Sequence, residues 1–202
     1  DGWARGTWAT CDSQNFDHFL SMNRLVAQLG VRVESPEWSI LTKDGNMEHC
    51  AYPDMHYYNS RKLGISYQVK PTGTYASRIV SIDIYNGQPR WGTYPDYPIL
   101  LNYNTTNGTR GLSIEPHTTA LDFVLALGEP TRKGGGEAGG ATARALGPAL
   151  WMEWTLTTSY TPLYLMAEFR GESARAPDRW ELGRGSCATW ATITLSILPP
   201  QT

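Results

Sequence analysis

The sequence predicts an α+β protein in which a helix followed by a small antiparallel sheet occurs twice within one domain. Three observations lead to this prediction. Apolar residues recur at helical spacing in Phe16–Leu29 and in Thr119–Leu127. Each segment ends next to a Leu-Gly pair, with glycines at Gly30 and Gly128, and glycine commonly ends helices. Runs of alternating polar and apolar residues, typical of strands, follow both segments.

The predicted boundaries divide the 202-residue chain into three segments of a single domain. Residues 10–88 form the first repeat, residues 89–112 an aromatic connector, and residues 113–200 the second repeat. Identity between the halves is slight, so the duplication is inferred from the order of the elements. In that order LGISYQV corresponds to LYLMAEF, and IVSIDIY corresponds to ATITLSI.

In the first half, the helix over Phe16–Leu29 is followed by a short apolar run, Trp38–Leu41. The turn signal at Lys43–Asn46 contains Asp-Gly, which favours hairpins, and Met47–Tyr52 then returns as a strand. Later strands are predicted at Leu63–Val69 and Ile79–Tyr85.

In the second half, His117-Thr-Thr119 can cap the helix over Thr119–Leu127, and Pro130 prevents its continuation. The Gly- and Ala-rich stretch Arg132–Gly147 is predicted to be a mobile loop. The stretch 172–184 is polar and irregular. Strands are predicted at Leu150–Leu156, Leu163–Phe169 and Ala188–Leu198.

The composition argues against some classes of function. The net charge is −2 and charged residues make up 18% of the chain, whereas general nucleic-acid binders carry a basic excess. Nucleic acid is therefore not an expected partner. No apolar run is long enough for a membrane-spanning helix, so no membrane partner is expected. The compartment stays open between cytoplasm and secretion, and so does the oligomeric state.

The cysteines and the glycosylation motifs do not decide the compartment. Cys11, Cys50 and Cys187 are few and unclustered, which favours reduced residues over a disulfide scaffold, although one pair could bridge. Asn104 and Asn107 begin two overlapping sequons in an Asn- and Thr-rich stretch. We interpret that stretch as an exposed loop, which would be a glycosylation site in a secreted protein.

Two groups of motifs resemble those of known proteins. The first group is Tyr52-Pro-Asp54, Tyr57-Tyr-Asn59, Leu63-Gly-Ile-Ser66 and Ser81–Asn86, and the second is Leu127-Gly-Glu-Pro130, Arg132–Gly136 and Trp151-Met-Glu-Trp154. Together they resemble motifs of a poorly characterised group of mainly fungal proteins. The helix, Leu-Gly-Glu-Pro and the following strands also resemble the repeat of the β-lactamase-inhibitor-protein and SmpA/OmlA-like folds. That resemblance implies a binding scaffold rather than a catalyst.

Aromatic residues are the first candidates for a binding surface. The chain has 8 Trp and 11 Tyr, two residue types that are enriched at interfaces. In the connector the candidates are Trp91, Tyr94 and Tyr97. Any function added to the repeated scaffold is expected in this connector or in the Gly-rich loop, because each occurs only once.

The predicted strand Leu150–Leu156 holds further candidates. The two-residue period places Trp151 and Glu153 on one face and Met152 and Trp154 on the other. An indole beside a carboxylate suits a sugar, because the ring stacks on C–H groups while the acid accepts hydroxyls. Trp151, Glu153 and Trp154 are therefore candidate ligand-binding residues, and a packed strand with a solvated Glu153 is the alternative.

Arg132 and Lys133 precede a run of glycines and are candidate anion-binding residues. Glycines let backbone N–H groups approach an anion closely. The run lacks the Gly-Lys-Ser/Thr ending of a phosphate loop and follows a helix instead of preceding one. A flexible loop is therefore the alternative.

No catalytic residue, metal site or cofactor is expected. His49, Cys50, Asp54 and His56 are of metal-ligating types, but their spacing matches no standard zinc site. Cys50 with a histidine could form a nucleophilic dyad, and a core cysteine is the alternative. A glycosidase would need a carboxylate pair, and the candidates in the second half are Glu115, Glu129, Glu137, Glu153, Glu168 and Glu172.

The sequence thus favours a non-catalytic, lectin-like binding protein whose ligand is a carbohydrate or another protein. Aromatic abundance together with low charge motivates this hypothesis. The first alternative is a protein inhibitor of a hydrolase. The second alternative is an enzyme that uses a carboxylate pair or Cys50 with a histidine, and an enzyme is less favoured than a binding protein.

Overall fold

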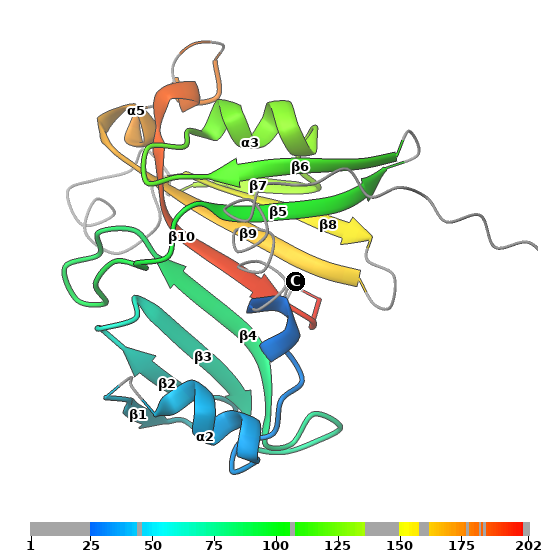
Figure 1. Ribbon diagram of the computed structural model, residues 1–202. Helices are drawn as coiled ribbons and strands as arrows, with labels where there is room; N and C mark the ends of the chain where they lie inside the picture. The colour runs from blue at the N-terminus through cyan, green and yellow to red at the C-terminus, as the bar shows by residue number, and fades with distance from the viewer. Residues whose placement is uncertain are drawn as a thin grey trace, which may run out of the picture.

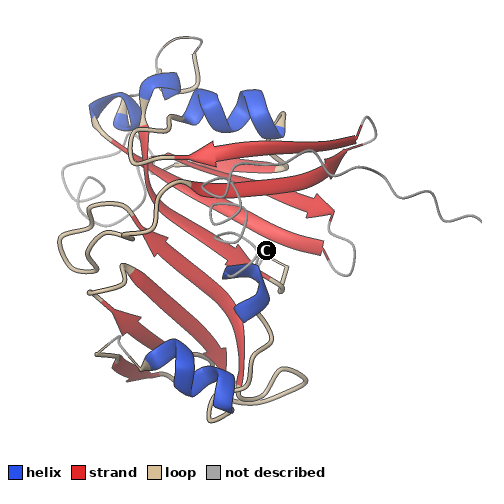
Figure 2. Cartoon of the chain, in the orientation of Figure 1, coloured by secondary structure: helices blue, strands red, loops and turns tan. Residues whose placement is uncertain are grey.

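The centre of the molecule is one large antiparallel sheet (Figures 1 and 2). The structure is a computed structural model and describes residues 25–43, 46–105, 108–135, 150–157, 162–176, 178–181, 183 and 185–199. Within them, an eight-stranded sheet has the order β1-β2-β3-β4-β10-β9-β8-β7, and a separate two-stranded sheet pairs β5 with β6.

The strands and helices have the following bounds. The strands are β1 (Glu48–Ala51), β2 (His56–Ser60), β3 (Ile65–Lys70), β4 (Arg78–Tyr85), β5 (Ile99–Thr105), β6 (Gly108–Ile114), β7 (Arg132–Gly134), β8 (Leu150–Thr157), β9 (Pro162–Arg170) and β10 (Thr189–Ser196). The helices are α2 (Pro36–Thr42), α3 (Ala120–Leu127), α5 (Glu172–Arg175) and the 3-10 helix η1 (Gly185–Cys187).

The predicted α+β class is confirmed as a large antiparallel sheet with few helices. Strands β1 to β4 form one meander and β7 to β10 another, and β4 pairs with β10 where the two meet. This order does not by itself establish a duplication, which stays a prediction. Among the described helices, none has the length and apolar character needed to cross a bilayer.

The alternation of polar and apolar residues located most of the central strands correctly. The six predicted strands correspond to β1, β3, β4, β8, β9 and β10. The predicted helix Thr119–Leu127 is α3, which starts at a capping box. Asp122 N donates to Thr119 Oγ1 at 3.4 Å, and Thr119 N donates to Asp122 Oδ2 at 2.7 Å. Gly128 ends the helix with φ 83°.

The apolar run Trp38–Leu41 is not part of a hairpin but lies in α2. The helix begins there because Ser35 Oγ accepts a hydrogen bond from Trp38 N at 3.2 Å. Pro36 stands in the first turn, where its missing N–H costs nothing. Trp38 packs edge-on against Tyr58 and Tyr67, with ring centroids 4.9 and 5.6 Å apart. The signal for a helix start thus outweighed the turn signal.

The connector predicted over residues 89–112 is also structured. Its second part forms β5 and most of β6, which pair in register from Ile99↔Ile114 to Thr105↔Gly108. Apolar residues at one end of the hairpin, Ile99 and Ile114, are fully buried. Figure 1 shows this hairpin crossing the sheet near β8 and β9, with α3 beside it. The hairpin was missed because its strands are rich in Asn, Thr and Gly.

Three further elements differ from the predictions. The predicted loop Arg132–Gly147 begins with β7, which pairs with β8, and its residues 136–147 lie outside the described part. The stretch 172–184 contains the short helix α5, and His56–Ser60 forms β2.

Of the predicted helix Phe16–Leu29, the structure describes the end, with Leu25–Gln28 helical. Cys11 and Asn107 lie outside the described residues, and no side-chain placement is described for Asn104.

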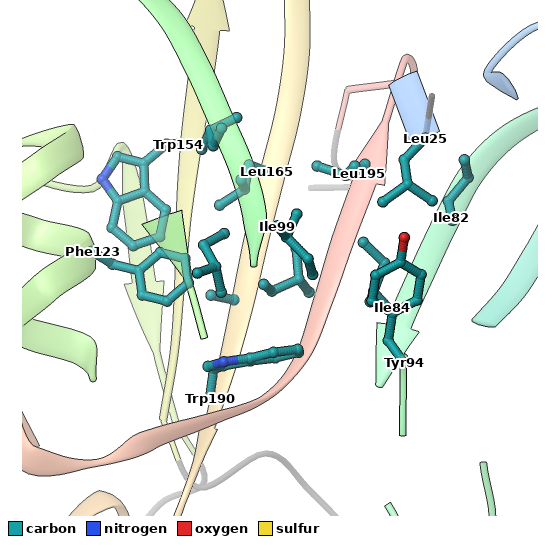
Figure 3. Packing of buried hydrophobic residues seen from close by; sticks show 14 of the residues in the cluster. Leu25, Ile82, Ile84, Tyr94, Ile99, Phe123, Trp154, Leu165, Trp190 and Leu195 are labelled. Atoms are coloured by element: carbon teal, nitrogen blue, oxygen red, sulfur yellow. The ribbon is translucent and has the colours of Figure 1, made fainter. Parts of the chain in front are cut away.

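The core fills one face of the eight-stranded sheet. Figure 3 shows Phe123 from α3, Ile99 from β5 and Leu25 packed over Trp154, Leu165, Leu195 and Ile82 of the sheet. Trp190 is fully buried, and its Nε1 donates to Glu115 O at 2.7 Å. The described helices α2 and α3 and the β5–β6 hairpin therefore all contribute to the same side of the sheet.

The segment between β4 and β5 is held against the start of β3 through a glycine. Tyr94 N donates to Tyr85 O at 2.8 Å, and Tyr85 N donates to Gly64 O at 2.9 Å. Gly64 has φ +57°, and a Cβ there would overlap the backbone of Thr93 and Tyr94. Only glycine permits this approach of the two backbones.

Replacing this glycine should separate the two segments. Gly64→Ala is expected to lower the free energy of unfolding by about 2 kcal/mol or more, because the methyl group meets backbone that cannot easily move. Gly73→Ala is the matched control. Gly73 also has a positive φ, +85°, but nothing lies within 4 Å of its added Cβ. Urea denaturation checks this, and equal losses in the two variants would contradict it.

Candidate functional site

The face of the eight-stranded sheet opposite the core carries polar and aromatic side chains, and we call it the open face. Neighbouring strands align these side chains in rows because alternate residues share a face. One row runs Ser66, Asp83, Thr194, Met166 and Glu153 across β3, β4, β10, β9 and β8. Parallel to it, a second row runs Tyr57, Gln68, Ser81, Ser196 and Tyr164.

The first depression on this face, the central hollow, has a volume of about 310 Å³. It combines the rings of Tyr57 and Tyr164 with the carboxylates of Asp54 and Glu153. The other lining residues are Met55, Gln68, Lys70, Val80, Ser81, Met166, Thr194, Ser196, Leu198 and Pro199. Aromatic rings, carboxylates and the ammonium group of Lys70 therefore line the same hollow.

The second depression, the aromatic hollow, has a volume of about 430 Å³. Asp54 and Tyr57 line both hollows, so the two share a wall. The remaining lining residues of the aromatic hollow are Cys50, Tyr52, Asn59, Asp83, Tyr85, Arg90 and Trp91.

A hydrogen-bond network fixes Asp83 between the two hollows. Gln68 Nε2 donates to Asp83 Oδ2 at 3.0 Å, and Thr194 Oγ1 donates to Asp83 Oδ1 at 2.7 Å. Beside it, the Tyr85 hydroxyl donates to Ser66 Oγ at 2.9 Å, and Ser66 donates in turn to Asn59 Oδ1. These bonds hold polar groups of four strands in one arrangement.

Three acidic groups of the open face, Asp83, Glu168 and Glu153, ionise less readily than usual. Burial raises the pKa of Asp83, and the hydrogen bonds from Thr194 and Gln68 oppose this effect. Burial also raises the pKa of Glu168, and the charge of Asp83 raises it further. The pKa of Glu153 is raised by burial and lowered by Arg132. Perturbed carboxyl groups of this kind gather at functional sites more often than elsewhere.

Trp151, Glu153, Arg132 and Trp91 lie on or beside the open face. Trp151 and Glu153 share it, and Met152 and Trp154 are buried on the other side, as the period predicted. The Arg132 guanidinium lies 4.0 Å from Glu153 Oε1 and 5.8 Å from the Trp151 ring centroid. Of these residues, Glu153 lines the central hollow and Trp91 the aromatic hollow.

Tyr94, Tyr97 and Trp154 pack on the core side instead. Tyr94 and Trp154 are buried, and Trp154 Nε1 donates to Gly128 O at 3.0 Å. The Tyr97 ring packs against Trp190 with centroids 6.1 Å apart. The connector turns toward the core because it continues into β5, so these rings cannot contact a ligand on the open face.

Lys133 and the first of the glycines after it make contacts within the protein. Lys133 Nζ lies 2.7 Å from Glu129 Oε1 and 5.5 Å from the Trp180 ring centroid. Gly134 lies under Trp151, because an added Cβ would be 2.6 Å from Cζ2 of that ring. The first of these glycines therefore serves packing.

Cys50 does not form a dyad with His49 or His56. His49 stacks on Tyr58 with centroids 4.4 Å apart and lies edge-on to His56 at 5.2 Å, on the face opposite Cys50. Cys50 Sγ instead lies 3.9 Å from Glu48 Oε1. Among the described residues, Cys50 and Cys187 are free thiols, and no group of three or more His, Cys, Asp or Glu could hold a metal ion.

Sequence reasoning missed Tyr57, Asp83, Tyr85 and Tyr164 as site residues. Alternation did place Asp83 and Tyr85 on one face of their strand. It could not show that this face stays open, because the elements covering the other face come from distant parts of the chain. A polar residue between two buried isoleucines, as at Asp83, was the available signal.

Comparisons of the chain with protein-family models, with curated proteins and with solved structures found no match. The resemblance to fungal proteins and to the β-lactamase-inhibitor-protein repeat therefore stays a prediction.

The raised pKa of Asp83 predicts how stability depends on pH. At a pH above the usual pKa of an aspartate, the Asp83 carboxyl group keeps its proton in the folded state but loses it in the unfolded state. Rising pH therefore destabilises the protein until Asp83 is ionised in both states. Asp83→Asn removes this contribution. The stability of the wild type relative to the variant should thus be greatest at and below about pH 4, the usual pKa of an aspartate, and should decrease as the pH rises above it.

Urea denaturation at a series of pH values measures this difference, and Asp96→Asn, at an exposed position outside both hollows, is the control. A wild-type advantage that stays constant or grows with pH would show that Asp83 is not destabilised by burial.

Proposed function

We propose that the protein is a non-catalytic binding protein whose open face takes a carbohydrate. One observation carries this proposal: the central hollow places the rings of Tyr57 and Tyr164 beside the carboxylates of Asp54 and Glu153 and the ammonium of Lys70. Aromatic rings offer flat apolar surface to the C–H groups of a sugar. Charged and amide groups accept and donate hydrogen bonds to its hydroxyls.

The arrangement of the lining residues supports a preformed site. They come from the adjacent strands of one sheet, mainly β2, β3, β4, β10, β9 and β8, whose ladders fix the spacing of the side chains. A site on strands needs little ordering when the ligand binds. A third row of the open face runs Tyr85, Thr192, Glu168 and Trp151, and Trp151 offers a further ring to an extended glycan.

A carboxylate-dependent enzyme is the second candidate function. It is favoured by Asp83 and Glu168, since the charge of one raises the pKa of the other. A catalytic pair must face the substrate directly, whereas both oxygens of Asp83 accept hydrogen bonds from the protein. The binding function therefore accounts for more of the open face.

The duplication of the halves forms part of this proposal. It is supported by the strand order, in which β1 to β4 and β7 to β10 are both meanders whose last strands pair. Such a scaffold would present both halves of the open face to one ligand.

The proposal predicts that Tyr164 contributes to binding. Tyr164→Ala should lower the affinity for the glycan that the wild type binds by roughly tenfold, because the substitution removes a ring from the central hollow. Tyr75→Ala is the control, since Tyr75 is 38% exposed and lines neither hollow. A glycan array identifies the ligand, and calorimetry compares the variants.

Three results would count against this function. A blank array would remove its basis, and inhibition of an enzyme in a hydrolase panel would then favour the inhibitor alternative. Equal weakening by Tyr164→Ala and Tyr75→Ala would place the ligand elsewhere. Cleavage of the bound glycan, lost in Glu168→Gln, would favour the enzyme.

A further inference from the structure

The aromatic hollow differs from the central hollow in its chemistry. Four of its nine lining residues are Tyr52, Tyr57, Tyr85 and Trp91, and their rings come in two pairs. Tyr52 and Tyr57 are edge-on, at 87° with centroids 5.7 Å apart. Tyr85 and Trp91 are stacked, at 21° and 6.0 Å. Rings thus border the hollow from β2, from β4 and from the segments beside them.

Carboxylates complete this lining. Asp54 is exposed where the β1–β2 turn borders the hollow, and Asp83 lies deeper, held by Gln68 and Thr194. Aromatic faces and carboxylates attract the same kind of group, because the negative face of a ring and a carboxylate both favour a cation. A neutral hydroxyl group can donate to a carboxylate, but it lacks the full positive charge that the ring faces also attract.

The chain itself places a cation at this site. The guanidinium of Arg90 lies over Trp91, with Cζ 4.5 Å from the ring centroid, and Arg90 lines the same hollow. Arg90 is an exposed residue, so its side chain can turn into solvent without opening the core. The Trp91 face is therefore suited to a positive charge and can be released for one.

We propose that the aromatic hollow binds an organic ammonium group, with the exposed carboxylate of Asp54 opposite its charge and the rings of Tyr57 and Trp91 against its C–H groups. This goes beyond carbohydrate binding in the central hollow and does not depend on it. The ammonium can belong to a quaternary amine or to an amino sugar, since both present the same charge. In either case the ligand displaces Arg90 from Trp91.

Titration of the full chain with choline tests the proposal. Binding is measured by the change in tryptophan fluorescence and by calorimetry. The neutral alcohol in which carbon replaces the nitrogen of choline is the matched control ligand. Choline should bind at least about fivefold more tightly than this alcohol, which has the same shape without the charge. A second arm compares the affinities for glucosamine and glucose. Tighter binding of glucosamine would identify an amino sugar as the source of the ammonium group.

Three kinds of variant distinguish a cation site from an anion site and from a structural role of Arg90. Asp54→Asn should weaken choline binding by about two- to fivefold, because it removes an exposed charge at the rim. Arg90→Ala should strengthen it by about two- to fivefold, because it removes the competing cation. Asp96→Asn, outside the hollow, and Tyr164→Ala, which is confined to the central hollow, should leave it unchanged.

The result for Arg90→Ala is decisive, because an anion site or a merely structural Arg90 predicts weaker binding or no change. The proposal is overturned if neither choline nor glucosamine binds, if the neutral partner binds as tightly as the cation, or if Arg90→Ala weakens binding or leaves it unchanged. Loss of glycan binding in Tyr164→Ala with intact choline binding would leave the ammonium site standing, so the two proposals fail separately.

Discussion

The pairing of β4 with β10 is the contact on which the rest of the structure depends. These strands are distant in sequence, and their register, from Tyr85↔Thr192 to Ser81↔Ser196, joins two meanders into one sheet. Side chains reinforce the junction, since Ser81 Oγ donates to Leu195 O and Thr194 Oγ1 donates to Asp83. Because the side-chain period is two, this single register places the core residues of both meanders on the same face. A slip by one residue would put the core residues of the two meanders on opposite faces of the sheet.

The two faces then follow different physical rules. On the core face, rings and branched side chains pack closely, and the indole N–H groups of Trp190 and Trp154 donate to backbone carbonyls of Glu115 and Gly128. The carboxyl groups of Asp83 and Glu168 on the open face are partly removed from water without a full countercharge, which raises their pKa. A sheet that buried no polar groups on this side would be simpler to stabilise. Their presence at the junction is what makes this face a candidate binding surface.

The periodicity of apolar residues was sufficient to predict elements whose pattern lies within the element itself. It was insufficient where contacts with distant parts of the chain decide the structure. It located β4 and β8 and the faces of Trp151 and Glu153, because alternation is a property of the strand itself. It failed for β5 and β6, whose polar residues mask a hairpin, and for α2, where the cap at Ser35 outweighs a short apolar run.

The candidate site was found only in part. Glu153 and Trp91 line the hollows, but Tyr94 and Trp154 do not, because which aromatic faces stay open depends on where α3 and the hairpin pack.

The shared wall between the two hollows has a thermodynamic consequence. Tyr57 and Asp54 line both, so an occupant that reorients either side chain changes the volume and the charge offered to its neighbour. Linkage requires that such an effect be reciprocal: whatever factor one ligand imposes on the affinity of the other is returned in full. The two proposed sites would therefore act as a single cooperative receptor, or as a pair of mutually exclusive ones, through the rotamers of Tyr57 and Asp54.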